Sequence, residues 1–310
     1  QVLESSGFNL KRNRTGRKHT SVEVCAAAID STVLIAGTED LSLLITESQS
    51  LKMISRVGIG LDGVPLKLCR DKGIIVSWTP DAVTSSVAEF TIGLMIAASR
   101  SIGRSDRELR SGVWRRPPSK RIQESAIGLV GFGRIGMRLA GLLRGFQPNQ
   151  VLVNDIKDKT SEIESFHASG LNISSASLDE LIACADIVSL HLPLWRLTAD
   201  LIDAKRLKKM RPGATIINTS RGGIINEDDL YSQLDSGHIG GAALDVFGEE
   251  PYCGPLRELD NVILTPHLGS CSFDARARME REAGQEALRF LGGAPLEQVV
   301  PETEYLYSSK

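Results

Sequence analysis

Short apolar runs alternate with longer segments of helical periodicity along the first part of the chain. Three of these runs predict buried strands: residues 33–35, 53–55 and 74–76. Helices are predicted between them over residues 41–50 and 64–70, and the second helix ends at Gly73. Strands that alternate with helices are typical of βαβ units, so this part of the chain predicts a parallel sheet.

A second alternating series begins near residue 126. It predicts six strands: residues 126–130, 151–155, 187–190, 215–218, 242–246 and 262–265. Apolar residues at i, i+4, i+7, i+8 and i+11, counted from Ile135, predict the helix after the first of them. Ser177 and Asn226 are predicted N-caps, and Gly237 is a predicted helix end. Six strands with intervening helices indicate one doubly wound α/β domain.

Further segments join and flank the two series. A long apolar helix is predicted over residues 83–101, where it is suited to lie between two domains, and an exposed basic arm over residues 105–120. An amphipathic helix over residues 274–291 can return to the first series. A chain of 310 residues is long for a single hydrophobic core. We therefore predict two domains, formed by residues 1–78 with 270–310 and by residues 79–269.

Composition excludes several classes of protein. A net charge of -2 gives no reason to expect nucleic acid or an anionic membrane as partner. No apolar run reaches the roughly 18–20 residues that a membrane span needs, and residues 1–20 are too polar for a signal peptide, although the chain does not begin with Met. Five cysteines without CxxC spacing predict reduced thiols in a cytoplasmic protein, and no metal site is expected.

A glycine-rich loop separates the strand at 126–130 from the helix after it. Gly131, Gly133 and Gly136 form the pattern G-x-G-x-x-G. In such a loop the first glycine makes a tight turn, the second lets the backbone approach a pyrophosphate, and the third allows close packing. The helix N-terminus then offers N–H groups to the phosphates. The pattern predicts a dinucleotide site.

An acidic residue follows at the spacing that this kind of site requires. Asp155 ends the next predicted strand, 155 − 136 = 19 residues after the last glycine. A carboxylate there can accept the ribose hydroxyls of NAD and would repel the extra phosphate of NADP. We predict NAD as the cofactor, while Lys157 nearby leaves room for use of both.

Three charged or titratable residues follow three of the predicted strands. Arg221, Glu250 and His267 come after the strands at 215–218, 242–246 and 262–265, so they should share one edge of the sheet with the glycine loop. An arginine can hold a carboxylate or a 2-oxo oxygen, and a histidine can exchange a proton with the developing alkoxide. A carboxylate beside that histidine would orient it.

Taken singly, each of these residues fits an ordinary surface or loop role. Their shared edge is what predicts a site. His191 is the main alternative as the acid, but it precedes a proline turn, and we interpret it as a residue that serves packing or backbone geometry.

With these residues the chain resembles the D-isomer-specific 2-hydroxyacid dehydrogenases, in particular their phosphoglycerate dehydrogenase-like branch. The resemblance is strongest over residues 51–289. It rests on the glycine loop and four further motifs: His191-Leu-Pro-Leu, Asn218-Thr-Ser-Arg-Gly-Gly, Ala243-Leu-Asp-Val-Phe and Pro266-His-Leu-Gly.

The resemblance implies two α/β domains, of which the first binds substrate, is flavodoxin-like and lacks one N-terminal βα unit of the family pattern. It implies that Arg221, Glu250 and His267 are catalytic, with Glu250 paired to His267, and that Asp245 binds the nicotinamide carboxamide. Further cofactor-binding residues would be Gly131, Gly133, Arg134, Ile135, Gly136, Asp155, Leu192, Pro193, Thr198, Thr219 and Gly269. Backbone N–H groups of the substrate loop would receive the substrate carboxylate, and Arg56 either meets a second anionic group or forms a structural ion pair. This loop comprises Arg56, Val57, Gly58, Ile59 and Gly60.

The resemblance also implies an activity and an assembly. We expect hydride transfer between NAD and a small anionic D-2-hydroxy or 2-oxo acid. A 3-phosphoglycerate-like substrate is one possibility, although Val83 stands where phosphoglycerate dehydrogenases often carry Asn. The alternatives are a glyoxylate or hydroxypyruvate reductase and a non-catalytic NAD(H)-sensing corepressor or scaffold. Such enzymes are usually homodimers joined through the NAD-binding domains, to which the arm at 105–120 would contribute.

Overall fold

The computed structural model describes residue 3 and residues 7–307. Within these residues the chain divides into two units: unit 1 belongs to Gln1–Val83 and Ser272–Lys310, and unit 2 is Thr84–Cys271. The functional domains expected from the sequence, residues 1–78 with 270–310 and residues 79–269, stay a prediction.

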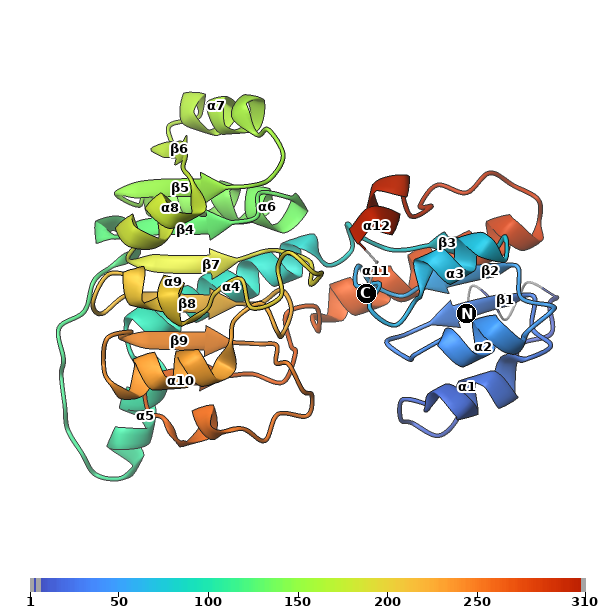
Figure 1. The fold of residues 1–310 in the computed structure, drawn as a ribbon, viewed down its shortest axis with the longest axis horizontal. Coiled ribbons are helices and arrows are strands. Elements are labelled where there is room, and N and C mark those ends of the chain that lie inside the picture. The colour runs from blue at the N-terminus through green and yellow to red at the C-terminus, as the bar shows by residue number, and fades with distance from the viewer. Residues whose placement is uncertain (1–2, 4–6, 308–310) are drawn as a thin grey trace. The chain divides into compact units, whose positions relative to one another are not determined.

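Unit 2 is built on a seven-stranded parallel sheet with the order β10-β9-β8-β7-β4-β5-β6 (Figure 1). The order reverses between β4 and β7, which is the switch point of a doubly wound sheet. The strands are β4 (Ala126–Val130), β5 (Gln150–Asn154), β6 (Ile173–Ser175), β7 (Ile187–Leu190), β8 (Thr215–Asn218), β9 (Gly241–Leu244) and β10 (Val262–Leu264). All six predicted strands of this series are therefore confirmed.

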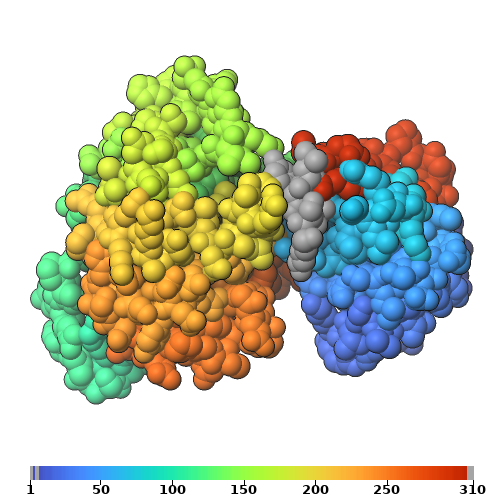
Figure 2. Space-filling view, in the orientation of Figure 1, coloured from blue at the N-terminus to red at the C-terminus, as the bar shows by residue number. Residues whose placement is uncertain are grey.

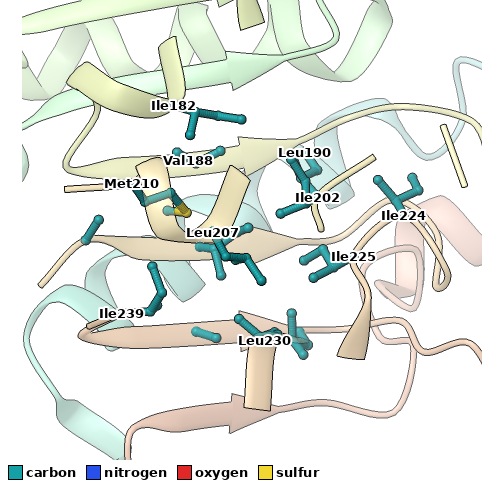
Figure 3. Packing of buried hydrophobic residues seen from close by; sticks show 14 of the residues in the cluster. Ile182, Val188, Leu190, Ile202, Leu207, Met210, Ile224, Ile225, Leu230 and Ile239 are labelled. Carbon is teal, nitrogen blue, oxygen red and sulfur yellow. The ribbon is translucent and has the colours of Figure 1, made fainter. Parts of the chain in front are cut away.

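Helices cover both faces of this sheet. One face carries α8 (Leu178–Cys184), α9 (Ala204–Lys209) and α10 (Glu227–Asp235), and the other carries α4 (Thr84–Ser99), α6 (Arg134–Leu143) and α7 (Thr160–Ala168). Figure 3 shows how Val188 and Leu190 of β7 pack against Leu207 of α9 and Ile182 of α8. Ile187 of the same strand belongs to the core on the opposite face. Strands buried on both faces read as continuous apolar runs, which is why they could be recognised in the sequence.

The predicted helix ends of unit 2 are confirmed. The Ser177 hydroxyl accepts the N–H of Glu180 at the start of α8, and the Asn226 side chain accepts the N–H of Asp229 at the start of α10. Gly237 follows α10 with φ +76°, a conformation that glycine adopts without steric cost. These caps set where each helix begins and ends at the sheet.

Three elements differ from the sequence prediction. Strand β6 was missed because Ile173 is its one buried residue, too short a signal for a strand. Helix α1 (Ser21–Ala28) was missed as well, since only Val24 and Ala28 are buried. The predicted arm begins as helix α5 (Ile102–Arg110) and continues as an exposed segment to Lys120, seen in teal and green at the margin of unit 2 in Figure 2. Its exposure is confirmed, but its helical first half was not foreseen.

Unit 1 holds a small parallel sheet of β1 (Val33–Ala36), β2 (Met53–Arg56) and β3 (Ile75–Ser77), in the order β1-β2-β3. Helix α11 (Phe273–Leu291) packs on β2, where the Ser55 hydroxyl donates to the carbonyl of Ala283 at 2.9 Å. Besides α1, the other helices of this unit are α2 (Ser42–Glu47), α3 (Leu66–Asp71) and α12 (Glu302–Tyr307). Short 3-10 helices occur in unit 2 at Ile122–Glu124, Arg144–Phe146 and Pro255–Glu258. None of the helices in the described residues is long and apolar enough to span a membrane.

Candidate active site

The glycine loop lies at the switch point, between the carboxyl ends of β4 and β7. Gly131 has φ +93°, and a Cβ on it would lie 2.4 Å from the carbonyl oxygen of His191. A Cβ on Gly136 would lie 2.3 Å from the carbonyl oxygen of Gly131. A Cβ on Gly133, which caps α6, would meet nothing within 4 Å. Gly131 and Gly136 thus allow the loop to fold tightly, and Gly133 leaves open space in front of the helix N-terminus.

Open space at a helix N-terminus suits an anion. The first turn of α6 begins with exposed Arg134 and half-buried Ile135. Its N–H groups and the positive end of the helix dipole favour a phosphate there. The geometry therefore fits the pyrophosphate of a dinucleotide, and the roles of these residues in binding one stay a prediction.

Asp155 directly follows β5 and holds the glycine loop. Its Oδ2 accepts the backbone N–H of Phe132 at 2.7 Å, and its Oδ1 accepts the N–H of Lys157 at 2.8 Å. A cavity of about 210 Å³ lies beside it, lined by Asp155, Lys157, Lys159 and Ser175 among others. The carboxylate predicted to bind ribose is thus fixed in position by the loop predicted to bind phosphate.

The segment after β7 closes on itself. The Thr198 hydroxyl donates to the carbonyl of Pro193 at 2.7 Å and accepts the N–H of Trp195 at 2.9 Å. Leu192 lies next to the glycine loop, since its side chain would be 2.9 Å from a Cβ on Gly131. The turn places Leu192 and Pro193 at the switch point, and the hydroxyl of Thr198 is used to hold the turn.

His191 has surroundings unlike those of His267. Burial lowers the pKa of His191 to about 4, and its Nε2 lies 3.0 Å from the Ser189 hydroxyl. Its Nδ1 is buried without a hydrogen-bond partner among the described residues. A histidine with this pKa is neutral at pH 7 and has no proton to donate as an imidazolium.

Asn218 shapes the turn that carries Arg221. Its Oδ1 accepts the backbone N–H and the hydroxyl of Ser220 at 3.0 and 2.8 Å, and its Nδ2 donates to the carbonyl of Arg221 at 2.8 Å. Thr219, between them, shares a buried hydrogen bond of 2.9 Å with Thr91 of α4. Because the Thr91 hydroxyl donates to the carbonyl of Val87 at 2.7 Å, Thr219 is the donor of the shared bond.

The arginine turn lies directly on the segment after β9. A Cβ on Gly222 would lie 1.8 Å from the carbonyl oxygen of Phe247, so only glycine fits at this contact. In the same segment, the Glu250 Oε1 accepts the N–H of Phe247 at 3.2 Å. Gly222 therefore allows the turn with Arg221 to approach the segment with Glu250.

Glu250 and His267 form a pair. The Nδ1 of His267 lies 3.0 Å from the Oε2 of Glu250, and the two side chains are 45% and 38% exposed. A carboxylate at Nδ1 favours the tautomer with hydrogen on that nitrogen, which leaves Nε2 to exchange a proton with a substrate. His267 also has φ +57°, which is uncommon for a residue other than glycine. The predicted pairing of these two residues is present in the structure.

Asp245 holds the segment that carries His267. Its carboxylate is buried and accepts the Thr265 hydroxyl at 2.6 Å and the N–H groups of Leu268 and Gly269 at 2.7 and 2.8 Å. Its carbonyl oxygen accepts the N–H of His267 at 2.9 Å. Sequence reasoning missed Thr265, although it immediately precedes the Pro-His motif.

The substrate loop of unit 1 is held by Arg56 and Thr79. Buried Arg56 donates through Nε to the carbonyl of Gly60 at 2.8 Å and through Nη1 to that of Val57. The N–H of Val57 is bonded to Ala36, and the N–H of Gly58 to the Thr79 hydroxyl, both at 2.8 Å.

Two donors of this loop are left over. Within the described part of the chain, the N–H groups of Ile59 and Gly60 have no acceptor. These two backbone N–H groups are therefore available to an anion. The sequence alone predicts this role for the backbone N–H groups of the whole loop.

No group of three or more His, Cys, Asp or Glu side chains that could hold a metal ion occurs in residue 3 or residues 7–307. The polar groups of the edge are instead bonded to one another and to the backbone.

Comparisons with known proteins agree on one family of enzymes. Residues 92–269 match the sequence pattern of the D-isomer specific 2-hydroxyacid dehydrogenases, NAD binding domain. The chain is 38% identical to a glyoxylate reductase of Thermofilum pendens over 79% of this chain and 73% of that one. It is 35% identical to a hydroxypyruvate reductase of Thermotoga maritima over 85% of both.

Two further similar proteins have names that refer to other acids. The chain is 36% identical to a D-3-phosphoglycerate dehydrogenase of Methanocaldococcus jannaschii over 91% of its own length, and it spans about half (54%) of that enzyme. The structure of a D-lactate dehydrogenase from Aquifex aeolicus with NAD and lactic acid matches with a TM-score of 0.80 at 26% identity, covering 88% of this chain and 87% of that one. The relatives thus share hydroxy- and oxo-acid chemistry and differ in substrate.

Proposed function

Because the chain belongs to the D-isomer specific 2-hydroxyacid dehydrogenase family, we propose that Arg221, Glu250 and His267 form its hydride-transfer site. The family makes the chain an NAD(P)-dependent 2-hydroxyacid dehydrogenase. The proposed reaction is the reversible reduction of a small 2-oxo acid to a D-2-hydroxy acid. The observation that carries the proposal is the 3.0 Å pair of Glu250 and His267 at the sheet edge that also bears the glycine loop.

The cofactor region fits a dinucleotide. Gly133 leaves room for a pyrophosphate at the start of α6, and Asp155 offers carboxylate oxygens at the end of β5. When bound, the reduced nicotinamide supplies the hydride. Asp155 supports NAD over NADP, because a carboxylate at this place repels a ribose phosphate.

The proton is assigned to His267. In the direction of reduction, Nε2 of the imidazolium donates a proton to the oxygen of the former carbonyl as the hydride arrives at the carbon. Glu250 accepts the hydrogen bond from Nδ1 and thereby orients the ring. General acid catalysis of this kind contributes roughly 10²–10⁴ in rate. His191 is a poor alternative, since its pKa of about 4 leaves it neutral at pH 7.

Substrate binding is assigned to one side chain and one loop. The planar guanidinium of Arg221 can hold the 2-oxo oxygen or the carboxylate through two hydrogen bonds. The unbonded N–H groups of Ile59 and Gly60 suit the substrate carboxylate. Both assignments favour a small anionic 2-oxo acid over a neutral carbonyl compound.

For the substrate we consider two kinds of acid, small unphosphorylated acids and phosphorylated ones. Relatives named as glyoxylate and hydroxypyruvate reductases support a small unphosphorylated acid. Relatives named as D-3-phosphoglycerate dehydrogenases support a phosphorylated one. We favour the unphosphorylated acid, because Nε and Nη1 of Arg56 already donate to carbonyls of its own loop.

We further propose a cytoplasmic homodimer joined through the NAD-binding domains. The segment after α5 carries Trp114, which is 80% exposed, and α5 carries Leu109, which is 57% exposed. Exposed apolar side chains of this size suit an interface. Sedimentation of the wild type and of the Trp114→Ala variant tests this, and a monomeric wild type would contradict it.

A substrate screen tests the function. NADH oxidation is measured with glyoxylate, hydroxypyruvate, pyruvate and 3-phosphohydroxypyruvate, and we expect turnover with at least one, most of all with the first two. Tight NADH binding without turnover of any of them would instead favour the non-catalytic sensing role.

A further inference from the structure

The carboxylate of Asp245 accepts several hydrogen bonds from the segment that carries His267. Three donors converge on it: the Thr265 hydroxyl and the N–H of Leu268 on Oδ1, and the N–H of Gly269 on Oδ2. The residue is 1% exposed, so these bonds stand in for the water that a carboxylate needs. The segment from Thr265 to Gly269 is wrapped around a single buried charge.

The Thr265 hydroxyl has one hydrogen, and its direction can be assigned. Its oxygen lies 2.6 Å from Oδ1 of Asp245 and 3.4 Å from the carbonyl oxygen of Leu244. Hydrogen bonds to an ionised acceptor are shorter and stronger than those to a neutral carbonyl, so the hydrogen points to the carboxylate. Thr265 is the one side chain among the three donors.

His267 depends on this arrangement for its backbone conformation. Its φ of +57° is unfavourable for a residue with a Cβ, and such conformations persist where the surroundings enforce them. The surroundings are bonds to Asp245 on both sides of His267, from Thr265 before it and from Leu268 and Gly269 after it. The N–H of His267 itself bonds to the carbonyl of Asp245 at 2.9 Å.

We propose that Thr265 is a positioning residue, which fixes the carboxylate of Asp245 and through it the orientation of His267 toward Glu250. Its consequence for turnover rests on the proposed function. A carboxylate has about four lone-pair positions, and three are used, which leaves one on Oδ2 for a further donor such as a carboxamide N–H. Without the Thr265 hydroxyl, one lone-pair position of Oδ1 is open to another donor, and only the backbone N–H groups of Leu268 and Gly269 hold the carboxylate.

The test compares Thr265→Val, which keeps the shape and removes the donor, with Thr265→Ser, which keeps the donor. Thr215→Val is the matched control, a buried threonine at the amino end of β8 in the same unit. Hydrogen bonds to charged groups are stronger than those between neutral groups. We therefore expect kcat to fall about tenfold in Thr265→Val. Thr265→Ser and Thr215→Val should stay within about twofold of the wild type.

A second readout does not require turnover. The ¹⁵N shifts of the histidine rings, measured through their carbon-bound protons at pH 8 and assigned with His267→Gln, report which ring nitrogen carries hydrogen. The chain has five histidines, so the spectrum is simple. We expect His267 to carry hydrogen on Nδ1 in the wild type and in Thr265→Ser, and to shift toward Nε2 in Thr265→Val.

The outcomes separate this proposal from the proposed function. A wild type that turns over none of the acids would refute the function, and the histidine spectra would still decide the role of Thr265. An unchanged His267 spectrum in folded Thr265→Val overturns the positioning role, whatever happens to kcat. If Thr265→Val does not fold, Thr265→Ala is judged by the same spectra.

Discussion

The carboxyl edge of the large sheet has two regions that are held in place in different ways. The cofactor region lies after β4 and β5, and its conformation depends on close backbone contacts. Because Gly131 and Gly136 have no Cβ, each can lie directly against a neighbouring carbonyl group. The catalytic region, after β8, β9 and β10, is shaped by buried side chains, with Asn218 and Asp245 each accepting or donating several hydrogen bonds. Close glycine contacts are the main feature of the first region. Buried side chains with several hydrogen bonds are the main feature of the second, where Gly222 adds one close contact.

This difference has a consequence for mutation. A side chain added at Gly131 or Gly136 must displace backbone, which should abolish binding of the dinucleotide. A side chain removed from the catalytic region leaves a buried donor or acceptor unpaired, which shifts the orientation of a reacting group. The first kind of change should act on cofactor affinity, and the second on turnover.

The largest effect on cofactor binding is expected at Gly136. A valine there must displace the carbonyl of Gly131, which lies 2.3 Å from the added Cβ. We expect NADH affinity, measured by fluorescence titration, to fall by at least about a hundredfold, because the loop can no longer fold around a pyrophosphate. Gly145→Ala is the control, since a Cβ there meets nothing within 4 Å. Equal affinities in the two variants would remove the steric account of the loop.

Gly222→Ala should show that glycine contacts also matter in the catalytic region, but for another step. The added Cβ would lie 1.8 Å from the carbonyl of Phe247, so the turn with Arg221 must move away from the segment with Glu250. A misplacement of about 1 Å can cost about a hundredfold in rate. We expect kcat/KM to fall by about that factor while NADH affinity stays within about twofold. Parallel losses of both would contradict the division between the two regions.

Asp155→Ala should have a moderate effect that is confined to the cofactor. The variant loses the carboxylate predicted to bind ribose and the contact with the N–H of Phe132. We expect the preference for NADH over NADPH to drop about tenfold, comparable to the loss of one charge-assisted interaction. The ratio of kcat/KM for the two cofactors measures it. A wild type that uses both equally well would show that Asp155 does not select.

The last prediction concerns His191, which affects stability rather than binding or turnover. Burial lowers its pKa from 6.5 to about 4, so between these pH values the unfolded chain binds a proton that the folded chain does not. Stability therefore falls as the pH drops through this window, by up to about 3 kcal/mol. Urea unfolding at pH 7 and pH 4.5 should show a smaller fall in His191→Asn than in the wild type. Identical falls would mean that His191 is not buried as a neutral ring.

The two regions also differ in how far the sequence could predict them. The glycine loop and Asp155 follow a fixed spacing along the chain, so their geometry could be foreseen. Arg221, Glu250 and His267 could be assigned to one edge because parallel strands end together. The Thr265 bond to Asp245 spans 20 residues and depends on the register of β9 and β10, which no spacing rule reveals.

Differences in burial also explain which elements of the fold were predicted and which were missed. Strands buried on both faces, such as β4, are continuous apolar runs, and β4 was recognised with correct bounds. Strand β6 lies at the edge of the sheet and buries Ile173 alone, so its sequence resembles that of a loop. Helix α5 buries none of its residues and therefore has no apolar face toward a core.

The central claim is that His267 donates the proton while the cofactor region binds independently of it. The most direct measurement compares His267→Ala with His167→Ala, an exposed histidine at the end of α7, in NADH titration and in steady-state reduction of the best 2-oxo acid. The account predicts that His267→Ala binds NADH within about twofold of the wild type and loses roughly 10²–10⁴ in kcat, while His167→Ala is unchanged. Turnover by His267→Ala at the wild-type rate would contradict it.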